Sequence, residues 1–446
     1  MQKRDIKIMV LVAIVLLLCP FINSVSANQL IITSWSNSVT NDNSTNITID
    51  VGETIRFSVS TNQENVSWNW IVDGEDQGVK DDTFTHNFER YGIYKIGVYG
   101  NNMNNSTQMI SWNATVVLSV TDDLDYTINL SKKPERIISL SPSNTEILFA
   151  LGLDSSIVGV TDFCNYPANV AEKDSVGSFT TPNAEEIVKL NPDLIIASYG
   201  NDMDVLTQLR SLNLTIFCLN PLNMDDIVCS ITTVGILTQE EENASVITED
   251  MNRRIGIIGN ETDSMSDLDK PRTLYIVWYD PMFVAGNETY ADDLITKAGG
   301  INIVSELDGW KEVNIESILD KNPHVIICSG MGGGSYTIRD SIMNDTVLAQ
   351  TDAIKNGRVY PIEDPNTIER AGPRIVDGLE TLYDLLVVST NGDDPSGIEP
   401  QPEQLPQNEP EKPVDTEDRS TIVPVFILAL AMVLLTTYII HRRRNA

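Results

Sequence analysis

Apolar and polar residues follow different patterns in the two halves of the chain, and this difference predicts two kinds of fold. Between residues 29 and 120, apolar side chains recur at every second position, as in NITIDVGETIRFSVS, and Gly, Asn and Asp interrupt the runs. A period of two is the spacing of a strand that buries one face. The pattern therefore predicts a small antiparallel β-sandwich over residues 29–120.

From about residue 134, apolar β-runs alternate with helical stretches, as in ERIISLS followed by NTEILFALG. Alternation of this kind predicts βα units around a parallel sheet. A long, mostly polar helical stretch at residues 238–266 separates two series of such units. The fold class is therefore α/β over residues 134–388, with an N-lobe at 134–237 and a C-lobe at 272–388, both Rossmann-like and joined by one backbone helix.

The two ends of the chain have the composition of membrane-targeting segments. Residues 1–27 combine a basic start, an apolar run and a small residue at the expected cleavage point, which is typical of a secretory signal peptide. Residues 421–440 are mostly apolar and precede an arginine cluster, which predicts a transmembrane helix. Residues 389–420, rich in Pro and Glu, predict an extended linker. We therefore expect a single-pass membrane protein with its folded body on the extracellular side.

The charge of the chain excludes one class of partner. Lys and Arg together number 30 and Asp and Glu number 63, which gives a formal net charge of -33. Nucleic-acid binding needs clustered positive charge, so no nucleic-acid partner is expected. The acidity, the Asn-x-Ser/Thr glycosylation sequons and the C-terminal anchor together suggest an archaeal cell surface.

Residues that carry metal or catalytic chemistry are sparse. The histidines are scattered, at His86, His324 and His441, so no metal site is expected. There is no GxSxG elbow, and no motif ties a histidine to a Ser or Cys nucleophile. We therefore expect no catalytic residues and no enzyme activity. The sequence alone does not exclude a pair of carboxylates that could catalyse glycoside hydrolysis. Cys218 and Cys229 are compatible with a disulfide or with two free thiols.

Five strings within residues 134–388 resemble a known family. They are RIISLSPSNTEILFALG, VGVTDFCNYP, NAEEIVKLNPDLIIAS, GWKEVNIESILDKNPHVII and IERAGPRIVDGLETL. Their order and spacing are similar to those of the helical-backbone substrate-binding proteins of ABC importers, which capture corrinoids such as vitamin B12, iron siderophores and haem. The corrinoid binders are the most similar group. The resemblance implies a protein without a resident cofactor, whose ligand is a cobalt corrinoid and whose partners are a permease dimer and its ATPase subunits.

The β-rich part resembles a PKD-type domain. The resemblance rests on Gly-Glu-Thr at 52–54, on Trp70 with Asp-Gly at 73–74, and on HNFERYGIYKIGV. A generic immunoglobulin-like sandwich is the alternative. Because its sequence offers no cluster of aromatic or cationic residues for a ligand site, we expect this domain to be a spacer.

Loops that follow the strands of both lobes are rich in aromatic residues. Flat rings suit a large planar ligand such as a corrin or porphyrin, and α/β proteins bind ligands beyond the carboxyl ends of their strands. By resemblance, Arg370 is a pocket arginine, with a structural salt bridge as its alternative role. Phe179 stands where the family often has tryptophan, and Asn366 where B12 binders have aspartate. The expected ligand-binding residues are Tyr166, Phe179, Tyr199, Trp278, Trp310, Asn366 and Arg370.

Two glutamates occupy matching places in the two lobes. Glu185 lies in NAEEIVKLNPD and Glu316 in NIESILDKNPH, and each is followed by an apolar helix turn and by Asn-Pro before a strand. In the family resembled, such a pair docks onto arginines of the two permease subunits, so we expect the same role here. The alternative is a carboxylate that only complements a helix dipole.

Two other functions stay open. The same aromatic residues suit an iron siderophore or haem in place of a corrinoid. An adhesion or sensor protein that reuses the fold, with the β-domain as its contact module, is the alternative from another class. Permease and ATPase genes beside this one would favour transport.

Overall fold

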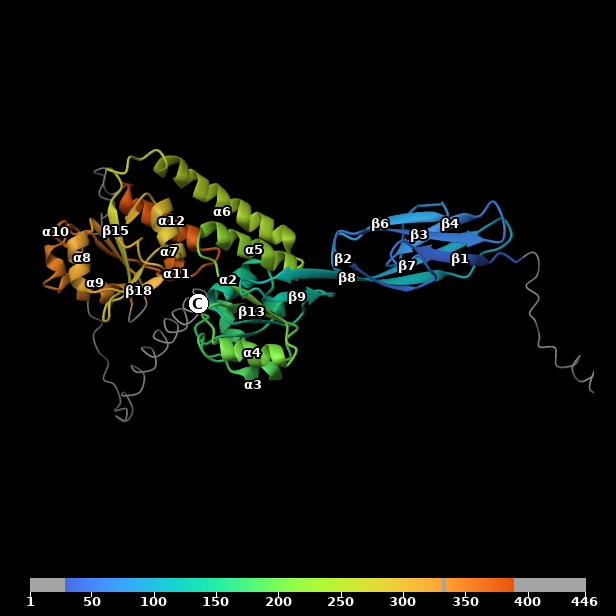
Figure 1. The fold of residues 1–446 in the computed structure, drawn as a ribbon, viewed down its shortest axis with the longest axis horizontal. Coiled ribbons are helices and arrows are strands. Elements are labelled where there is room, and N and C mark those ends of the chain that lie inside the picture. Colours follow the sequence, from blue (N-terminus) through green and yellow to red (C-terminus); the bar gives the residue numbers. More distant parts are fainter. Residues whose placement is uncertain (1–28, 331–333, 389–446) are drawn as a thin grey trace, which may run out of the picture. The chain divides into compact units, whose positions relative to one another are not determined.

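The computed structural model describes residues 29–330 and 334–388 of the chain (Figure 1). The chain divides into two compact units. The first unit comprises Met1–Ser119 and Asn129–Lys132, and the second comprises Val120–Ile128 and Lys133–Ala446. Each unit has an apolar core of its own, and each is described by itself below.

The first unit is a β-sandwich of two sheets around an aromatic core. A three-stranded sheet has the order β1-β3-β6, and a six-stranded sheet has the order β2-β8-β7-β4-β5, with β9 paired to β8. Phe57, Trp70 and Trp112 have no exposed surface, and the ring centroids of Phe57 and Trp112 lie 5.1 Å apart. The strands are β1 Ile32–Asn37, β2 Asn46–Asp50, β3 Thr54–Thr61, β4 Ser67–Val72, β5 Glu75–Asp76, β6 Thr83–Asn87, β7 Gly92–Asn101, β8 Ile110–Thr121 and β9 Thr127–Leu130.

The N-lobe of the second unit is built on a five-stranded sheet of order β12-β11-β10-β13-β14, in which every pairing is parallel. Its strands are short apolar runs, such as LIIAS, because helices cover such a sheet on both faces. Its elements are β10 Ile137–Ser139, α2 Pro142–Ala150, η1 Asp154–Ser156, β11 Ile157–Val160, η2 Ala168–Glu172, β12 Asp174–Ser175, α3 Ala184–Lys189, β13 Leu194–Ser198, α4 Met203–Ser211 and β14 Ile216–Leu219.

The C-lobe has a mixed sheet of order β18-β16-β15-β19-β20, with β17 paired to β15. Its centre is parallel, and β16 and β18 add an antiparallel edge. Its elements are β15 Arg272–Trp278, β16 Phe283–Ala285, α7 Tyr290–Lys297, β17 Ile301–Asn302, β18 Trp310–Glu312, α8 Ile315–Lys321, β19 Val325–Cys328, α9 Ser335–Met343, η3 Leu348–Gln350, α10 Asp352–Lys355, β20 Val359–Pro361, α11 Asn366–Glu369 and α12 Ile375–Leu386.

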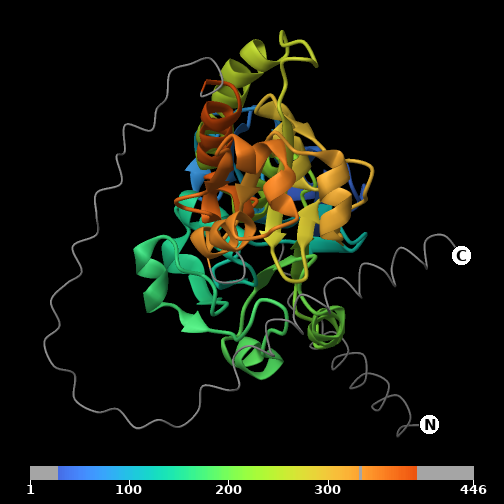
Figure 2. The same ribbon diagram turned by 90° about the vertical axis from the view of Figure 1, so that its left-hand side faces the viewer.

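Two consecutive helices join the lobes. Helix α5, Met224–Thr238, ends at Gln239, whose positive φ of 55° turns the chain into α6, Glu241–Thr262. Helix α6 packs on α5 and on α12; it runs along both lobes in Figure 1, and Figure 2 shows it beside α12. Arg254 of α6 makes two hydrogen bonds to Glu380 of α12, at 2.8 and 2.6 Å, and fixes the helix to the C-lobe.

A short hairpin at the start of the second unit is fixed to the N-lobe by a buried aspartate. Asp122 accepts hydrogen bonds from the main-chain N–H groups of Leu124, Tyr126 and Cys218, at 2.9, 2.9 and 3.1 Å. Its carboxylate, which has no exposed surface, also pairs with Arg210 of α4 at 3.1 Å. The Arg210 guanidinium lies 3.7 Å from the centroid of the Tyr126 ring. These contacts join the hairpin firmly to α4 and β14.

The described structure corrects the predicted localisation. None of the helices within residues 29–330 and 334–388 is long and apolar enough to cross a membrane, so a single-pass membrane protein is not supported. A bilayer-spanning helix needs about 20 mostly apolar residues. Helix α6 has 22 residues, but it carries charged side chains along its length. The signal peptide, the linker and the segment at 421–440 lie outside the described residues.

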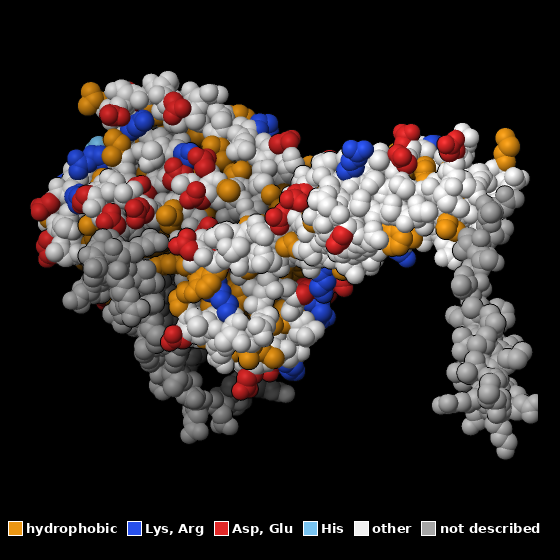
Figure 3. All heavy atoms as spheres, turned by 45° about the vertical axis from the view of Figure 1, so that its right-hand side comes forward, with side chains coloured by type: hydrophobic (Ala, Val, Ile, Leu, Met, Phe, Trp, Pro, Cys, Tyr) orange, Lys and Arg blue, Asp and Glu red, His pale blue; other side chains and the backbone are white. Residues whose placement is uncertain are grey.

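Acidic side chains do not form a single patch on the face drawn in Figure 3. Asp and Glu side chains are scattered there among neutral ones.

The cysteines of the described residues are not paired. Cys164, Cys218, Cys229 and Cys328 are free thiols, so Cys218 of β14 and Cys229 of α5 are not bonded to each other. Burial raises the pKa of the Cys218 thiol, and it also raises that of Cys328 to about 12. Both thiols are therefore protonated components of the core.

Gly378 is required for close packing of α12, and Gly378→Ala is expected to lower the free energy of unfolding by about 1–3 kcal/mol. A Cβ at this position would lie 2.3 Å from the carbonyl oxygen of Thr367, which belongs to the backbone and cannot rotate away. Gly256→Ala is the matched control, because nothing lies within 4 Å of its Cβ position on α6. That change should raise stability by up to about 1 kcal/mol. Urea denaturation of both variants measures their free energies of unfolding, and equal stability of the two variants would contradict the packing argument.

Candidate functional site

In the N-lobe, the loop after β13 positions an aromatic ring. A Cβ on Gly200 would lie 2.5 Å from the Cζ atom of Phe179, so glycine allows that ring to lie directly on the backbone. Asn201 is buried, and its side-chain N–H group donates to the carbonyl oxygens of Leu140 and Phe179, at 2.9 and 2.6 Å. These contacts hold Phe179 beside Tyr199, at the carboxyl end of the sheet.

In the C-lobe, three aromatic residues support the segment that follows β20. Trp310 meets Tyr275 and Tyr290 edge-on, with ring centroids 6.3 and 5.9 Å apart. The Tyr275 and Tyr290 hydroxyl groups donate to the carbonyl oxygens of Ile368 and Glu369, at 3.3 and 2.5 Å. Burial raises the pKa of both tyrosines above its ordinary value, so they act here as neutral donors.

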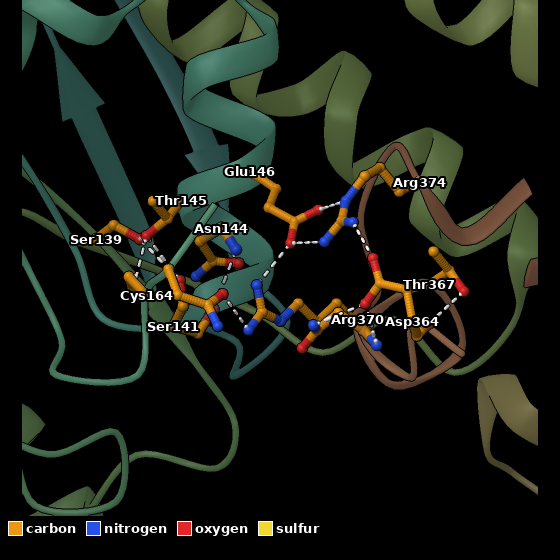
Figure 4. Close-up of polar contacts among 12 residues, drawn as sticks. Ser139, Ser141, Asn144, Thr145, Glu146, Cys164, Asp364, Thr367, Arg370 and Arg374 are labelled. Atoms are coloured by element: carbon orange, nitrogen blue, oxygen red, sulfur yellow. Dashed lines mark hydrogen bonds and ion pairs between the residues drawn. The ribbon is translucent and has the colours of Figure 1, made fainter. Parts of the chain in front are cut away.

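Glu146 of α2 joins the two lobes. It is a single carboxylate within an apolar helix, and only 2% of its side chain is exposed. Its Oε1 atom accepts from Arg370 Nη1 and from Arg374 Nη2, both at 2.8 Å, and its Oε2 atom accepts from Arg374 Nε at 2.8 Å. Figure 4 shows the carboxylate between the two guanidinium groups. Contacts between residues more than 220 positions apart therefore connect α2 of the N-lobe with the chain before α12.

Each arginine also donates a hydrogen bond to a second acceptor. Arg370 Nη2 donates to Oδ1 of Asn165 at 2.8 Å, and Arg374 Nη1 donates to Oδ2 of Asp364 at 2.7 Å. The Arg374 guanidinium lies 3.9 Å from the centroid of the Tyr166 ring, and 45% of Tyr166 is exposed. We call these six residues the interlobe cluster: Asn165, Tyr166 and Glu146 from the N-lobe, and Asp364, Arg370 and Arg374 from the C-lobe.

Two members of the interlobe cluster have pKa shifts that favour their charged forms. The hydrogen bonds that Arg374 donates to Glu146 raise the pKa of Arg374 above its ordinary value. Burial disfavours the charged form of Asp364, but hydrogen bonds from Asn366 and Arg374 outweigh it and lower the pKa of that carboxyl. Both shifts favour the ion pair between Arg374 and Asp364.

The structure places three of the seven expected ligand-binding residues in or against this cluster. Tyr166 and Arg370 belong to it, and Asn366 donates its side-chain N–H to Asp364 at 2.8 Å. Trp310 packs against Tyr290, whose hydroxyl group donates to the carbonyl oxygen of Glu369, and Phe179 lies against Gly200, the residue after Tyr199. Trp278 ends β15 and donates its indole N–H to the carbonyl oxygen of Asp280 at 2.8 Å. Their roles toward a ligand stay predictions.

Sequence reasoning missed Glu146 and Arg374. Both lie in strings that carry the family resemblance, TEILFALG and GPRIVDGLE. A lone carboxylate inside an apolar helix is itself a signal, because a buried charge needs a partner. The salt bridge considered as an alternative for Arg370 is present.

Glu185 and Glu316 occupy matching positions in their lobes. Each is the second residue of its helix, α3 or α8, and each is exposed. The caps also match: Asn183 accepts from the N–H of Glu186 at 3.3 Å, and Asn314 accepts from the N–H of Ser317 at 2.7 Å, and each donor is the third residue of its helix. Both helices are followed by an Asn at positive φ, Asn191 at 47° and Asn322 at 42°, and then by a proline.

A separate groove, with a volume of about 390 Å³, lies between α6 and α12. It is lined by Arg253, Arg254, Ile257, Ile258, Glu380, Tyr383 and Asp384. Its polar lining is taken up by the ion pair of Arg254 with Glu380 and by the hydrogen bond from Tyr383 to Glu261. It contains none of the expected ligand-binding residues, and its contacts attach the backbone helix to the C-lobe.

Two curated proteins similar to the chain each cover about 60% of it. The chain is 28% identical over 280 residues to the uncharacterised ABC transporter substrate-binding lipoprotein YvrC of Bacillus subtilis, covering 61% of this chain and 86% of that protein. It is 29% identical over 271 residues to the vitamin B12-binding protein of Vibrio cholerae, covering 60% of this chain and 95% of the relative.

Two crystal structures extend the comparison. The periplasmic vitamin B12 binding protein BtuF of Vibrio cholerae matches with a TM-score of 0.52 at 28% identity, covering 58% of this chain and 98% of that one. A possible iron-binding periplasmic solute-binding protein of Staphylococcus epidermidis matches with a TM-score of 0.50 at 31% identity, covering 57% and 99%.

A family model described as periplasmic binding protein matches residues 137–365, just over half of the 446 residues. The match lies within the second unit and includes Glu146, Glu185, Glu316 and the aromatic loops of both lobes. The first unit lies outside it, so the PKD resemblance stays a prediction. With two α/β lobes, two joining helices and this match, the chain belongs to the periplasmic binding protein family.

Proposed function

We propose that this protein is the substrate-binding component of an ABC importer and that its ligand is a corrinoid. Members of the family are solute-binding proteins rather than enzymes, and two of the similar proteins are named for binding vitamin B12. The observation that carries the ligand class is the set of aromatic side chains at the carboxyl ends of strands in both lobes. Phe179 and Tyr199 follow strands of the N-lobe, and Trp278 ends β15 of the C-lobe.

The charges near these rings favour a corrinoid over haem. Haem carries two carboxylates, which need unpaired positive charge, whereas the arginines of the interlobe cluster already bind Glu146 and Asp364. Haem iron also needs an axial ligand such as His or Tyr. Among the described residues, His86 lies in the first unit, and His324 lies at the amino end of β19, away from the aromatic loops. Tyr166 is stacked under Arg374.

We further propose that Glu185 and Glu316 dock onto the permease. Their matching caps and equal places in α3 and α8 support this role, because a helix-dipole function alone would not require the same position in both lobes. The partners are then a permease dimer and its ATPase subunits. The β-sandwich is proposed as a spacer that does not contribute to ligand affinity.

Ligand titration tests the proposed function. Cobinamide, cobalamin, haem and a ferric hydroxamate siderophore are each added to the purified full chain while tryptophan fluorescence is recorded. A corrinoid should quench the signal with saturation at micromolar concentration or below, and haem should bind at least about tenfold more weakly, a difference of about 1.4 kcal/mol. Binding of haem or the siderophore without any corrinoid binding would contradict the ligand while leaving the family intact.

A further inference from the structure

The arginines of the interlobe cluster make five hydrogen bonds within the protein, to Glu146, Asn165 and Asp364. Arg370 uses Nη1 on Glu146 and Nη2 on Asn165, while Arg374 uses Nε and Nη2 on Glu146 and Nη1 on Asp364. Only 11% of the Arg370 side chain and 17% of the Arg374 side chain are exposed. A ligand carboxylate that reached the other N–H groups would therefore meet two guanidinium charges that Glu146 and Asp364 already balance.

Displacement of Glu146 is unfavourable for two reasons. The carboxylate is buried, so breaking its pairs would leave an uncompensated charge within the protein. A ligand carboxylate placed beside it would also bring three negative charges against two positive ones. An uncharged amide meets neither obstacle, because it adds no charge and can hydrogen-bond at the exposed rim of the cluster, where Asn165 and Tyr166 lie.

We propose that Glu146 is a specificity-determining residue that excludes ligands with carboxylate groups at this side of the site and selects ligands whose periphery carries amides. The proposal rests on the proposed function and narrows its substrate class. Within the corrinoids it predicts preference for cobinamide, whose side chains end in amides, over cobyrinic acid, which has the same ring with carboxylates. The charge of Glu146, rather than its shape, sets the preference.

Glu146→Gln removes the charge and keeps the size of the side chain. Its amide oxygen still accepts from one arginine, while the other guanidinium regains a free donor for a ligand carboxylate. We expect the ratio of affinities for cobinamide over cobyrinic acid to fall by about tenfold, mainly because cobyrinic acid binds more tightly. Glu380→Gln is the matched control, because Glu380 also accepts two bonds from one arginine but lies between α6 and α12. In the Glu380→Gln variant, the ratio of affinities for cobinamide over cobyrinic acid should equal that of the wild type.

Asp364→Asn gives a second test if Glu146→Gln folds poorly. Asp364 is about half exposed and accepts from only one arginine N–H group, on Arg374 Nη1, so the change should lower the same ratio by a smaller factor. Calorimetric titration of both corrinoids and thermal melts are recorded for every variant. If the wild type binds cobinamide and both variants keep the wild-type ratio, the role of Glu146 is wrong and the proposed function stands. If the wild type binds neither corrinoid, the proposed function fails and the inference fails with it.

Discussion

Replacing Glu185 and Glu316 together with alanine should reduce ligand uptake at least about tenfold while ligand affinity in solution stays at the wild-type value. Both carboxylates are exposed and stand at the same position of matching helices, so neither contributes to a core. Loss of both would remove one contact from each lobe and with it the attraction that speeds association. Uptake is measured in vesicles that contain the permease and ATPase subunits, and affinity is measured by calorimetry.

The control for this prediction uses acidic residues of the same two helices. Glu186 of α3 pairs with Lys189 of its own helix, and Asp320 of α8 is also exposed. Alanine at both positions makes the same change in net charge and should leave uptake near the wild-type level. Normal uptake by the Glu185/Glu316 variant, or an equal loss in the control, would show that docking does not depend on these two residues.

Asp122→Ala should lower the free energy of unfolding of the second unit by about 3–5 kcal/mol. The carboxylate has no exposed surface and accepts from three main-chain N–H groups and from Arg210. Its removal would leave these donors and a largely buried guanidinium without an acceptor, and an unsatisfied buried donor costs about 1–3 kcal/mol. Urea denaturation followed by circular dichroism gives the value.

Asp125→Asn is the matched control, because Asp125 is an exposed residue of the same hairpin at a positive φ of 64°, which asparagine tolerates. It should change stability by less than about 0.5 kcal/mol. A loss below about 1 kcal/mol for Asp122→Ala would mean that water replaces the carboxylate and that the hairpin is not fixed to the N-lobe in solution.

Local patterns in the sequence were sufficient to predict much of the fold. Period-two alternation indicated the β-sandwich, and the alternation of apolar β-runs with helical stretches indicated the two lobes. Matching strings around Glu185 and Glu316 revealed equivalent helices, because an Asn cap and a following Asn-Pro are local signals. Antiparallel strands at the edge of the C-lobe sheet were not foreseen, since β16 and β18 have only three residues each.

The candidate site was harder to predict because it depends on contacts between distant residues. Arg370 was assigned to a ligand, with a salt bridge as the alternative, and its partner Glu146 lies 224 positions away. No spacing rule connects two residues so far apart in the sequence. For the same reason, the sequence did not predict that Arg374 pairs with the same carboxylate. The position of Glu146 within an apolar helix was the available indication. It predicts that the carboxylate has a partner, but it does not identify the partner residue.

The most direct measurement of the central claim is native mass spectrometry of the full chain mixed with equal amounts of cobinamide, haem and a ferric hydroxamate siderophore. A one-to-one complex whose added mass is that of cobinamide should dominate, because the rings contributed by both lobes suit a planar macrocycle and the interlobe cluster offers no free positive charge to haem. A dominant complex with haem or with the siderophore would contradict the account.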